Sequence, residues 1–175
     1  HLDTMVQTAA RMDAADDQFF PVFSAAPTVD QRVFQSVFDR HDLEFPVWGA
    51  DSRSLLEAST LALLASGTVT MEATFSCTPM VVGYRTSWVT WYLGQLISEM
   101  DNVAMPNLIH DEVFVPEFLQ GDFEVDRLTD CLIDYLTDRV KLKEQREILR
   151  SITDTFGERS PTAEVGDRIL EVLNG

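Results

Sequence analysis

The sequence has 175 residues, of which 45% are hydrophobic and 24% charged, a composition that excludes wholesale disorder and fits one folded domain. Lys and Arg number 13 and Asp and Glu number 29, so the formal net charge is −16. A chain this acidic lacks the basic surface that nucleic acid requires, and we expect no nucleic-acid partner. Only Lys141 and Lys143 are lysines, a bias typical of the hydrated surfaces of salt-adapted proteins.

The two cysteines, Cys77 and Cys131, lie far apart in the sequence and show no metal-ligand spacing. We therefore expect reduced thiols in a cytosolic protein, and no metal site. The first residues form a polar helical pattern without the apolar run of a secretory signal, and no stretch reaches the roughly 18 apolar residues of a membrane span. The chain opens without a methionine and already inside that helical pattern, which we interpret as a piece of something longer.

Taken in chain order, the first 84 residues alternate between helical and apolar extended patterns. The predicted strands cover residues 19–24, 45–48, 61–66 and 79–84. The predicted helices cover residues 2–14, 28–41, 51–59 and 67–76. Apolar strands separated by short helices predict βαβ crossovers, and therefore a parallel sheet covered on both faces. The ligand of such a sheet lies beyond the carboxyl ends of its strands.

Beyond Tyr84 the pattern changes to amphipathic helices and turns. Residues 86–100 predict a strongly aromatic amphipathic helix that carries Trp88, Trp91 and Tyr92. The segments 105–109 and 115–120 are predicted to be turn-like. Further amphipathic helices are predicted over residues 124–140, 141–156 and 163–175.

The stretch Ser66-Gly67-Thr68-Val69-Thr70-Met71-Glu72 runs from a strand end into a helix start. Gly67 lets a ligand approach the backbone, and Thr68 and Thr70 lie in the first helical turn beside unpaired N–H groups, an arrangement that binds phosphate. Glu72, one turn further, is placed to accept hydrogen bonds from a ribose diol. The alternative is a simple N-cap followed by a first-turn acid. No Gly-Lys-Ser/Thr follows, which excludes a Walker A loop.

A wider set of motifs gives this stretch a context. The segments ALLASGTVTMEATFSCTPMVVGYRTS, WYLGQLIS, MPNLI and VPEFLQ follow one another in an order and spacing that resemble the C-terminal half of lipid-A-disaccharide synthase. The resemblance covers residues 2–120, and the terminal helices more loosely. A strand followed by an S-G-T-x-x-x-E helix, then P-x-V-V-x-Y-R, P-N-L and P-E-x-x-Q, is a specific combination.

The resemblance implies the C-terminal domain of a GT-B glycosyltransferase: an α/β, Rossmann-like parallel sheet with helices on both faces and extra C-terminal helices. Residues 1–122 would form the nucleotide-sugar-binding domain, lacking its first strand, and residues 123–175 helices packed on the same domain. The implied reaction transfers 2,3-diacylglucosamine from UDP to 2,3-diacylglucosamine-1-phosphate in lipid A biosynthesis. No cofactor and no metal are implied.

The resemblance also implies roles for individual residues. Gly67 and Thr68 would lie near the UDP diphosphate and Glu72 at the ribose, with Ser66 and Thr70 in the same donor site. Asn107 of the P-N-L segment corresponds to a family residue needed for donor binding or catalysis. Arg85 would assist in phosphate binding, the alternative being an ion pair on the acidic surface. These alternatives stay open from the sequence.

The chain also departs from the family pattern. A Gly-Ser-Arg loop and the first strand normally precede the first helix, and here the sequence starts at that helix. The N-terminal domain that receives the lipid acceptor is also absent from this sequence, so we expect no transferase activity from this chain alone.

Two roles are open for the aromatic residues of the predicted helix 86–100. Trp88, Trp91 and Tyr92 would contact the inner membrane surface from the cytoplasmic side, or else pack in the core or against a subunit. Residues 86–100 hold no Lys or Arg, so we expect no electrostatic attraction to anionic head groups there.

Two other functions remain from the sequence: another UDP-GlcNAc-type GT-B transferase or epimerase, and a non-catalytic nucleotide-binding module. His110 precedes Asp111, a pair that invites a general-base interpretation, but we interpret it as a histidine of a surface loop. We expect His1 and His41 to be solvated.

Overall fold

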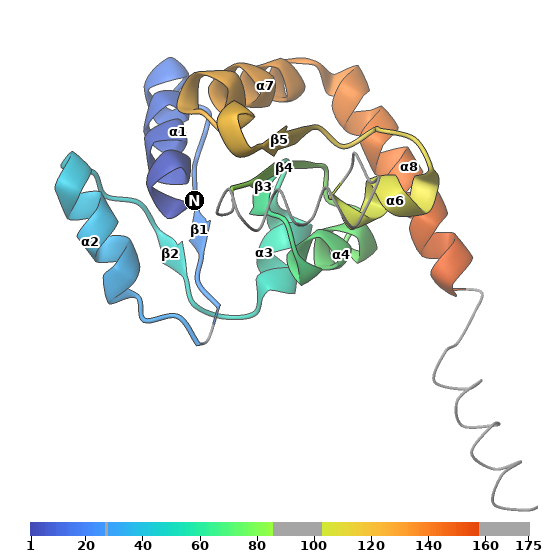
Figure 1. The fold of residues 1–175 in the computed structure, drawn as a ribbon, viewed down its shortest axis with the longest axis horizontal. Helices are drawn as coiled ribbons and strands as arrows, with labels where there is room; N and C mark the ends of the chain where they lie inside the picture. Colours follow the sequence, from blue (N-terminus) through green and yellow to red (C-terminus); the bar gives the residue numbers. More distant parts are fainter. Residues whose placement is uncertain (27, 86–102, 158–175) are drawn as a thin grey trace, which may run out of the picture.

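The computed structural model describes residues 1–26, 28–85 and 103–157 of the chain (Figure 1). Helices and short parallel strands alternate along it. In chain order the elements are α1 (Leu2–Ala15), β1 (Phe23–Ser24), α2 (Arg32–His41), β2 (Val47–Trp48), α3 (Ser52–Ala58), β3 (Ala62–Ala65), α4 (Thr68–Phe75), β4 (Met80–Tyr84), α6 (Met105–His110), β5 (Glu117–Leu119), the 3-10 helix η1 (Gln120–Asp122), α7 (Val125–Thr137) and α8 (Arg139–Gly157).

All the described strand pairs are parallel, which confirms the predicted α/β class with crossover helices. The strands are divided between two sheets: β1 pairs with β2, and β3, β4 and β5 form a second sheet in that order. Within the described residues, no ladder joins β1 to β3, so the predicted parallel sheet occurs as two pieces. Among the described residues, the first predicted strand, residues 19–24, pairs only at Phe23–Ser24.

Two segments predicted to be turn-like are regular structure instead. Residues 105–109 lie in α6, where Pro106 occupies the first helical turn and needs no N–H partner. Residues 115–120 contain β5, whose pairing with β4 begins where the Val82 N–H donates to the Pro116 carbonyl at 2.9 Å. The prediction was wrong here because short segments containing proline match turn patterns, whereas the open edge of β4 supplies a partner that no local pattern reveals.

The three-stranded sheet is covered on both faces, as predicted (Figure 1). Alternate residues of β4 point to opposite sides. Val81 packs in a cluster with residues of α1 and α7, whereas Met80 and Val82 pack in a second cluster with residues of α3, α4 and α8. Because β4 is the middle strand, Met80, Val81 and Val82 are fully buried.

Helix α1 joins the two sheets, since it contributes to the core on each side. Val6 packs with β1 and α2, and Met12 packs with Val81 of β4 and with α7. The α2 side is rich in phenylalanine: Phe23, Phe34, Phe38 and Phe45 contact one another with ring centroids 5.4–6.4 Å apart. Edge-to-face ring packing of this kind stabilises a small core.

The helices α7 and α8 pack on the three-stranded sheet. Leu128 of α7 shares the cluster of Val81, and Leu149 of α8 shares the cluster of Val82. Gln145 of α8 is buried and binds the start of β4: it accepts from the Met80 N–H at 2.6 Å and donates to the Met80 carbonyl at 3.2 Å. The predicted division at residue 122 stays a prediction.

The predicted aromatic helix with Trp88, Trp91 and Tyr92, and the predicted last helix, lie outside the described residues. None of the helices in the described ranges is long and apolar enough to cross a bilayer.

Candidate functional site

The turn between β3 and α4 is the centre of the candidate site. Its Gly67 has φ 153° and ψ −162°, a conformation that residues with a Cβ rarely adopt. A Cβ built at Gly67 would meet none of the described residues within 4 Å, so none of their side chains lies against this backbone. The glycine therefore permits the turn and places no side chain of its own against the start of α4.

The carboxyl ends of β3 and β4 lie side by side at this turn. Ala65 of β3 is in register with Gly83 of β4, and the Ser66 N–H donates to the Gly83 carbonyl at 3.3 Å. Ser66 and Arg85 therefore emerge at one edge of the sheet, as the topology of parallel strands predicts.

The hydroxyl groups predicted to bind the donor differ in what they contact. The Ser66 Oγ donates to the Val103 carbonyl at 3.1 Å, and the Thr70 Oγ1 donates to the Gly67 carbonyl at 2.7 Å. Thr70 is fully buried, whereas Thr68 is exposed in the first turn of α4. Thr68 is thus the predicted threonine that is exposed beside the N–H groups at the start of the helix.

Glu72 lies on the exposed side of α4, where its Oε2 accepts from the Ser52 Oγ at 2.5 Å. Ser52 is the first residue of α3, and Asp51 caps that helix by accepting from the Arg53 and Ser54 N–H groups. The pKa of Asp51 is lowered below its usual range, mainly by the hydrogen bond from the Ser54 hydroxyl and further by these backbone hydrogen bonds. The sequence predicted the start of this helix, but its contact with Glu72 depends on the packing of α3 on α4.

Arg85 is held by backbone carbonyls and an aromatic ring. Its Nε donates to the Gln120 carbonyl at 3.2 Å and its Nη2 to the Phe123 carbonyl at 2.9 Å, and the guanidinium carbon lies 5.8 Å from the Phe123 ring centroid. Within the described residues Arg85 forms no ion pair, so the surface-pair alternative finds no support there. No carboxylate of the described residues neutralises its positive charge.

Asn107 is 1% exposed and uses its whole amide inside the protein. Its Nδ2 donates to the Val115 carbonyl at 2.9 Å and to Glu117 Oε1 at 2.7 Å. Its Oδ1 accepts from the N–H groups of Phe114 at 3.1 Å and Val115 at 2.9 Å. An asparagine amide offers two donors and two acceptor positions, so this set is full. The role predicted for Asn107 in donor binding or catalysis stays a prediction.

Sequence reasoning missed Glu117, although the P-E-x-x-Q segment that contains it was recognised. Besides the Asn107 amide, its carboxylate accepts from the N–H groups of Val103 at 2.7 Å and Ala104 at 3.2 Å. The available signal was the pairing of two motifs, P-N-L and P-E-x-x-Q, ten residues apart.

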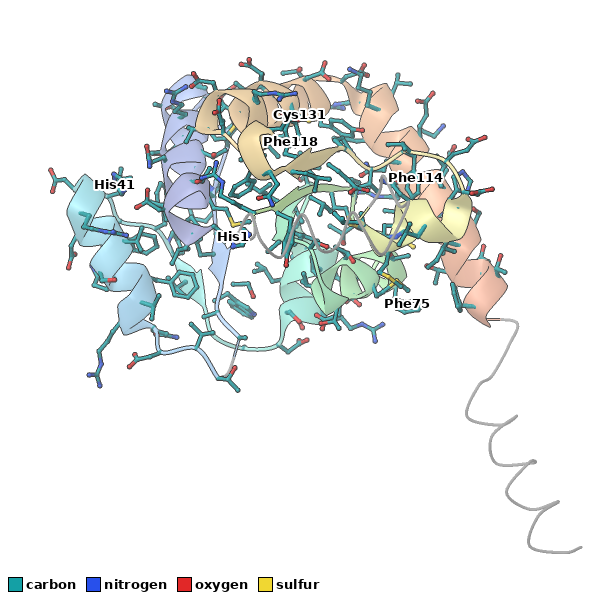
Figure 2. The ribbon with its side chains drawn as sticks, viewed as in Figure 1. His1, His41, Phe75, Phe114, Phe118 and Cys131 are labelled. Carbon is teal, nitrogen blue, oxygen red and sulfur yellow. The ribbon has the colours of Figure 1, made fainter. Side chains whose placement is uncertain are left out.

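The side chains of His1 and His41, labelled in Figure 2, both have partners in the structure. His1 Nε2 accepts from the Arg85 N–H at 2.8 Å, and its ring lies 5.6 Å from that of Tyr84. His41 Nε2 lies 3.0 Å from Asp3 Oδ1, and this bond is the largest cause that lowers the pKa of Asp3. His1 is exposed, as predicted, whereas His41 is half-buried, because the tertiary contact with Asp3 brings it a partner.

The described residues hold no cluster of three or more His, Cys, Asp or Glu side chains suited to a metal ion. The site contains a glycine turn, helix N–H groups, an exposed threonine, a nearby carboxylate and an arginine without an acidic partner among the described residues. Helix N–H groups and a guanidinium are groups that bind phosphate, and an exposed carboxylate one turn away suits a diol.

Comparison with known proteins gives a consistent picture. Residues 1–164 match the protein family described as lipid-A-disaccharide synthetase. A lipid-A-disaccharide synthase from Anaeromyxobacter sp. (strain K) is 33% identical over 175 residues, which cover 98% of this chain and 45% of that protein. The enzyme from Myxococcus xanthus (strain DK1622) is 28% identical over 172 residues, with the same two shares. That from Haemophilus influenzae (strain 86-028NP) is 34% identical over 137 residues, 77% of this chain and 35% of that protein. The chain thus spans less than half the length of these curated relatives.

Proposed function

The chain belongs to the lipid-A-disaccharide synthetase family, and we propose that it is the part of such a glycosyltransferase that binds the donor, UDP-2,3-diacylglucosamine. The complete enzyme would transfer 2,3-diacylglucosamine from UDP to 2,3-diacylglucosamine-1-phosphate and release UDP. Acceptor binding would belong to the portion of the relatives that this chain does not cover.

The observation that carries this proposal is the β3–α4 turn. Gly67 holds a backbone conformation that suits glycine, and no described residue would come within 4 Å of a Cβ there. A diphosphate placed there would accept hydrogen bonds from the first N–H groups of α4 and from the exposed Thr68 hydroxyl. Glu72, one turn further along the helix, would then accept hydrogen bonds from the ribose.

Charge supports an anionic ligand at this edge despite the net charge of −16. Arg85 follows β4 at the same edge, and no carboxylate of the described residues neutralises it. A guanidinium held by two carbonyl groups is oriented in advance, which lowers the entropy lost when phosphate binds.

Calorimetric titration with UDP tests the donor site. We expect binding by the folded chain, or by any longer form of the protein that contains it, and about a tenfold higher Kd for Glu72→Ala, the effect of losing about 1.4 kcal/mol of ribose contacts. Glu112→Ala is the matched control, because Glu112 is equally an exposed glutamate but lies beyond α6. A folded protein that shows no UDP binding would contradict the donor-site proposal.

Activity separates this function from the alternatives. We expect the 175-residue chain alone to form no disaccharide from the two lipid substrates, and a full-length protein containing it to form the tetraacyl product. A full-length protein that binds UDP but uses only UDP-GlcNAc would point instead to another GT-B transferase or epimerase. Binding without any transfer would point to a nucleotide-binding module.

We also propose that the protein works at the cytoplasmic surface of the inner membrane and contacts it through Trp88, Trp91 and Tyr92. The support is the sequence pattern and the lipid nature of the proposed substrates. Cosedimentation with vesicles of neutral lipid tests the contact. Replacing the three aromatic residues by serine is expected to abolish it, and unchanged cosedimentation of that variant would contradict the proposal.

A further inference from the structure

A chain of hydrogen bonds links β5 to the turn at the end of β3. Glu117 of β5 accepts from the Val103 N–H at 2.7 Å and from the Ala104 N–H at 3.2 Å. The carbonyl of the same Val103 accepts from the Ser66 Oγ at 3.1 Å. Val103 is therefore held on both sides, by a carboxylate at its N–H and by a site hydroxyl at its carbonyl.

The orientation of the Glu117 carboxylate is determined by its surroundings. Its Oε1 also accepts from the Nδ2 of Asn107 at 2.7 Å, and Asn107 is bound in turn to the backbone of Phe114 and Val115. Pairing of β5 with β4 places Glu117 opposite Val82, in the middle of the buried strand. A rotation of the side chain would therefore break three hydrogen bonds at once.

We propose that Glu117 is a positioning residue of the donor site, and that its carboxylate acts through Val103 on the Ser66 hydroxyl and the Gly67 turn. The inference rests on the proposed function only for the identity of the ligand. Ser66 immediately precedes Gly67, whose backbone conformation is sensitive to how its neighbours are held. The bond to Val103 fixes the Ser66 side chain, and with it the direction in which the chain enters α4.

The chemistry of the contact requires a carboxylate. Three N–H donors converge on two oxygens, so the group must accept only. A glutamine has the same shape, but its NH2 group would face a donor and leave that pair unsatisfied. No cation pairs with Glu117 among the described residues, so these N–H groups are what holds its charge.

The test combines three variants, Glu117→Gln, Ser66→Ala and the double variant, with UDP titration as the probe. We expect each single variant to raise the UDP Kd about tenfold, and the double variant to raise it no further, because both changes interrupt one relay. Glu117→Asp, which keeps an acceptor-only group, is expected to recover part of the loss. Glu112→Gln is the charge-matched control and is expected to bind UDP as the parent does.

A second readout does not depend on the ligand. Backbone amide NMR shifts of Gly67 and Thr68 are expected to change in free Glu117→Gln, and Glu117→Gln is expected to change them no further in a protein that already carries Ser66→Ala. If Glu117→Gln fails to fold, Ser66→Ala reports from the other end, with expected shifts at Val103 and Ala104.

Two results would overturn the coupling of Glu117 to the donor site through Ser66. Effects of Glu117→Gln and Ser66→Ala that multiply to about a hundredfold would show that the residues act independently, and would overturn the relay. A Glu117→Gln variant that is less stable in urea but binds UDP normally would reduce Glu117 to a structural role. If the parent protein itself fails to bind UDP, the donor-site proposal fails, and the amide shifts then decide the coupling between Glu117 and Ser66.

Discussion

Replacing Asn107 by alanine distinguishes a residue that only touches substrate from one that builds the site. A purely catalytic asparagine could be removed with no loss of stability. The structure predicts a large loss instead, because the amide of Asn107 is 1% exposed and all its hydrogen-bonding positions are used by the protein.

The magnitude follows from the groups left behind. Alanine orphans the N–H groups of Phe114 and Val115 and the Val115 carbonyl, and each unsatisfied buried group costs about 1–3 kcal/mol. Glu117 keeps its two backbone donors and contributes less. Partial relaxation of the short α6–β5 connection lowers the sum, so we expect Asn107→Ala to reduce the free energy of unfolding by about 3 kcal/mol.

Urea denaturation followed by circular dichroism measures this change. With a slope of about 1–3 kcal/mol per molar urea, a loss of about 3 kcal/mol lowers the midpoint by roughly 1–3 M. Glu112→Ala, in the exposed connection after α6, is the control and is expected to stay within about 0.5 kcal/mol of the parent. An Asn107→Ala protein as stable as the parent, with an unchanged slope, would refute the reasoning.

Three further predictions follow from single residues. Gly83→Ala places a Cβ against the ring of the buried Phe123, so it is expected to lower the free energy of unfolding by about 1–3 kcal/mol in thermal denaturation. Gly121→Ala, whose Cβ would meet no described residue within 4 Å, is expected to be nearly neutral. Equal melting temperatures would contradict this. Gln145→Leu removes the hydrogen-bond partner of the Met80 N–H, the Met80 carbonyl and the Phe114 carbonyl. It is expected to lower the free energy of unfolding, measured in urea, by about 2–4 kcal/mol. Glu144→Leu, on the exposed side of α8, is the control and is expected to change it little. Burial raises the pKa of Cys131 to about 11. Its alkylation by iodoacetamide is therefore expected to be slow at pH 8 and to become faster as the pH approaches 11. Fast alkylation at pH 8 would contradict this burial of the thiol.

The same thiol makes stability depend on alkaline pH. An unfolded cysteine loses its proton near pH 8.5, whereas burial keeps Cys131 protonated to about pH 11 in the folded protein. The folded state therefore binds more protons between these values, and its stability falls as the pH rises through this range. Cys131→Ser is expected to weaken this fall of stability with pH. An unchanged fall would show that other groups cause it, and Tyr135, whose pKa burial raises to about 12, is one such group.

Local patterns in the sequence were sufficient for much of the fold. The helices α1, α2, α3, α4, α7 and α8 were predicted from local helical patterns, and β3 and β4 from short apolar runs, because these signals act over one or two turns of chain. A side-chain cap contributes at α3, where Asp51 accepts from two N–H groups. The Ser66–Gly67–Thr68 turn was also predictable, since it consists of consecutive residues between a strand and a helix. Family membership followed from motifs whose order is visible in one dimension.

The sequence could not predict contacts between segments that lie apart in the chain and show no periodic pattern. β5 became a strand only because β4 offers an open edge, and α6 only because Pro106 fits a helix start that Glu117 binds through Val103 and Ala104. The role of Glu117 itself depends on three donors from two segments meeting at one carboxylate.

The sequence by itself therefore determined the class of fold, the glycine turn between β3 and α4 and the family of the protein, because each depends on residues that are neighbours in the chain. Only the tertiary structure decided which predicted site residues remain open to a ligand. Thr68, Glu72 and Arg85 are exposed, whereas Thr70 and Asn107 are buried and use their polar groups within the protein. The physical reason is that burial and hydrogen-bond satisfaction depend on what folds against a side chain, and a motif records only the side chain.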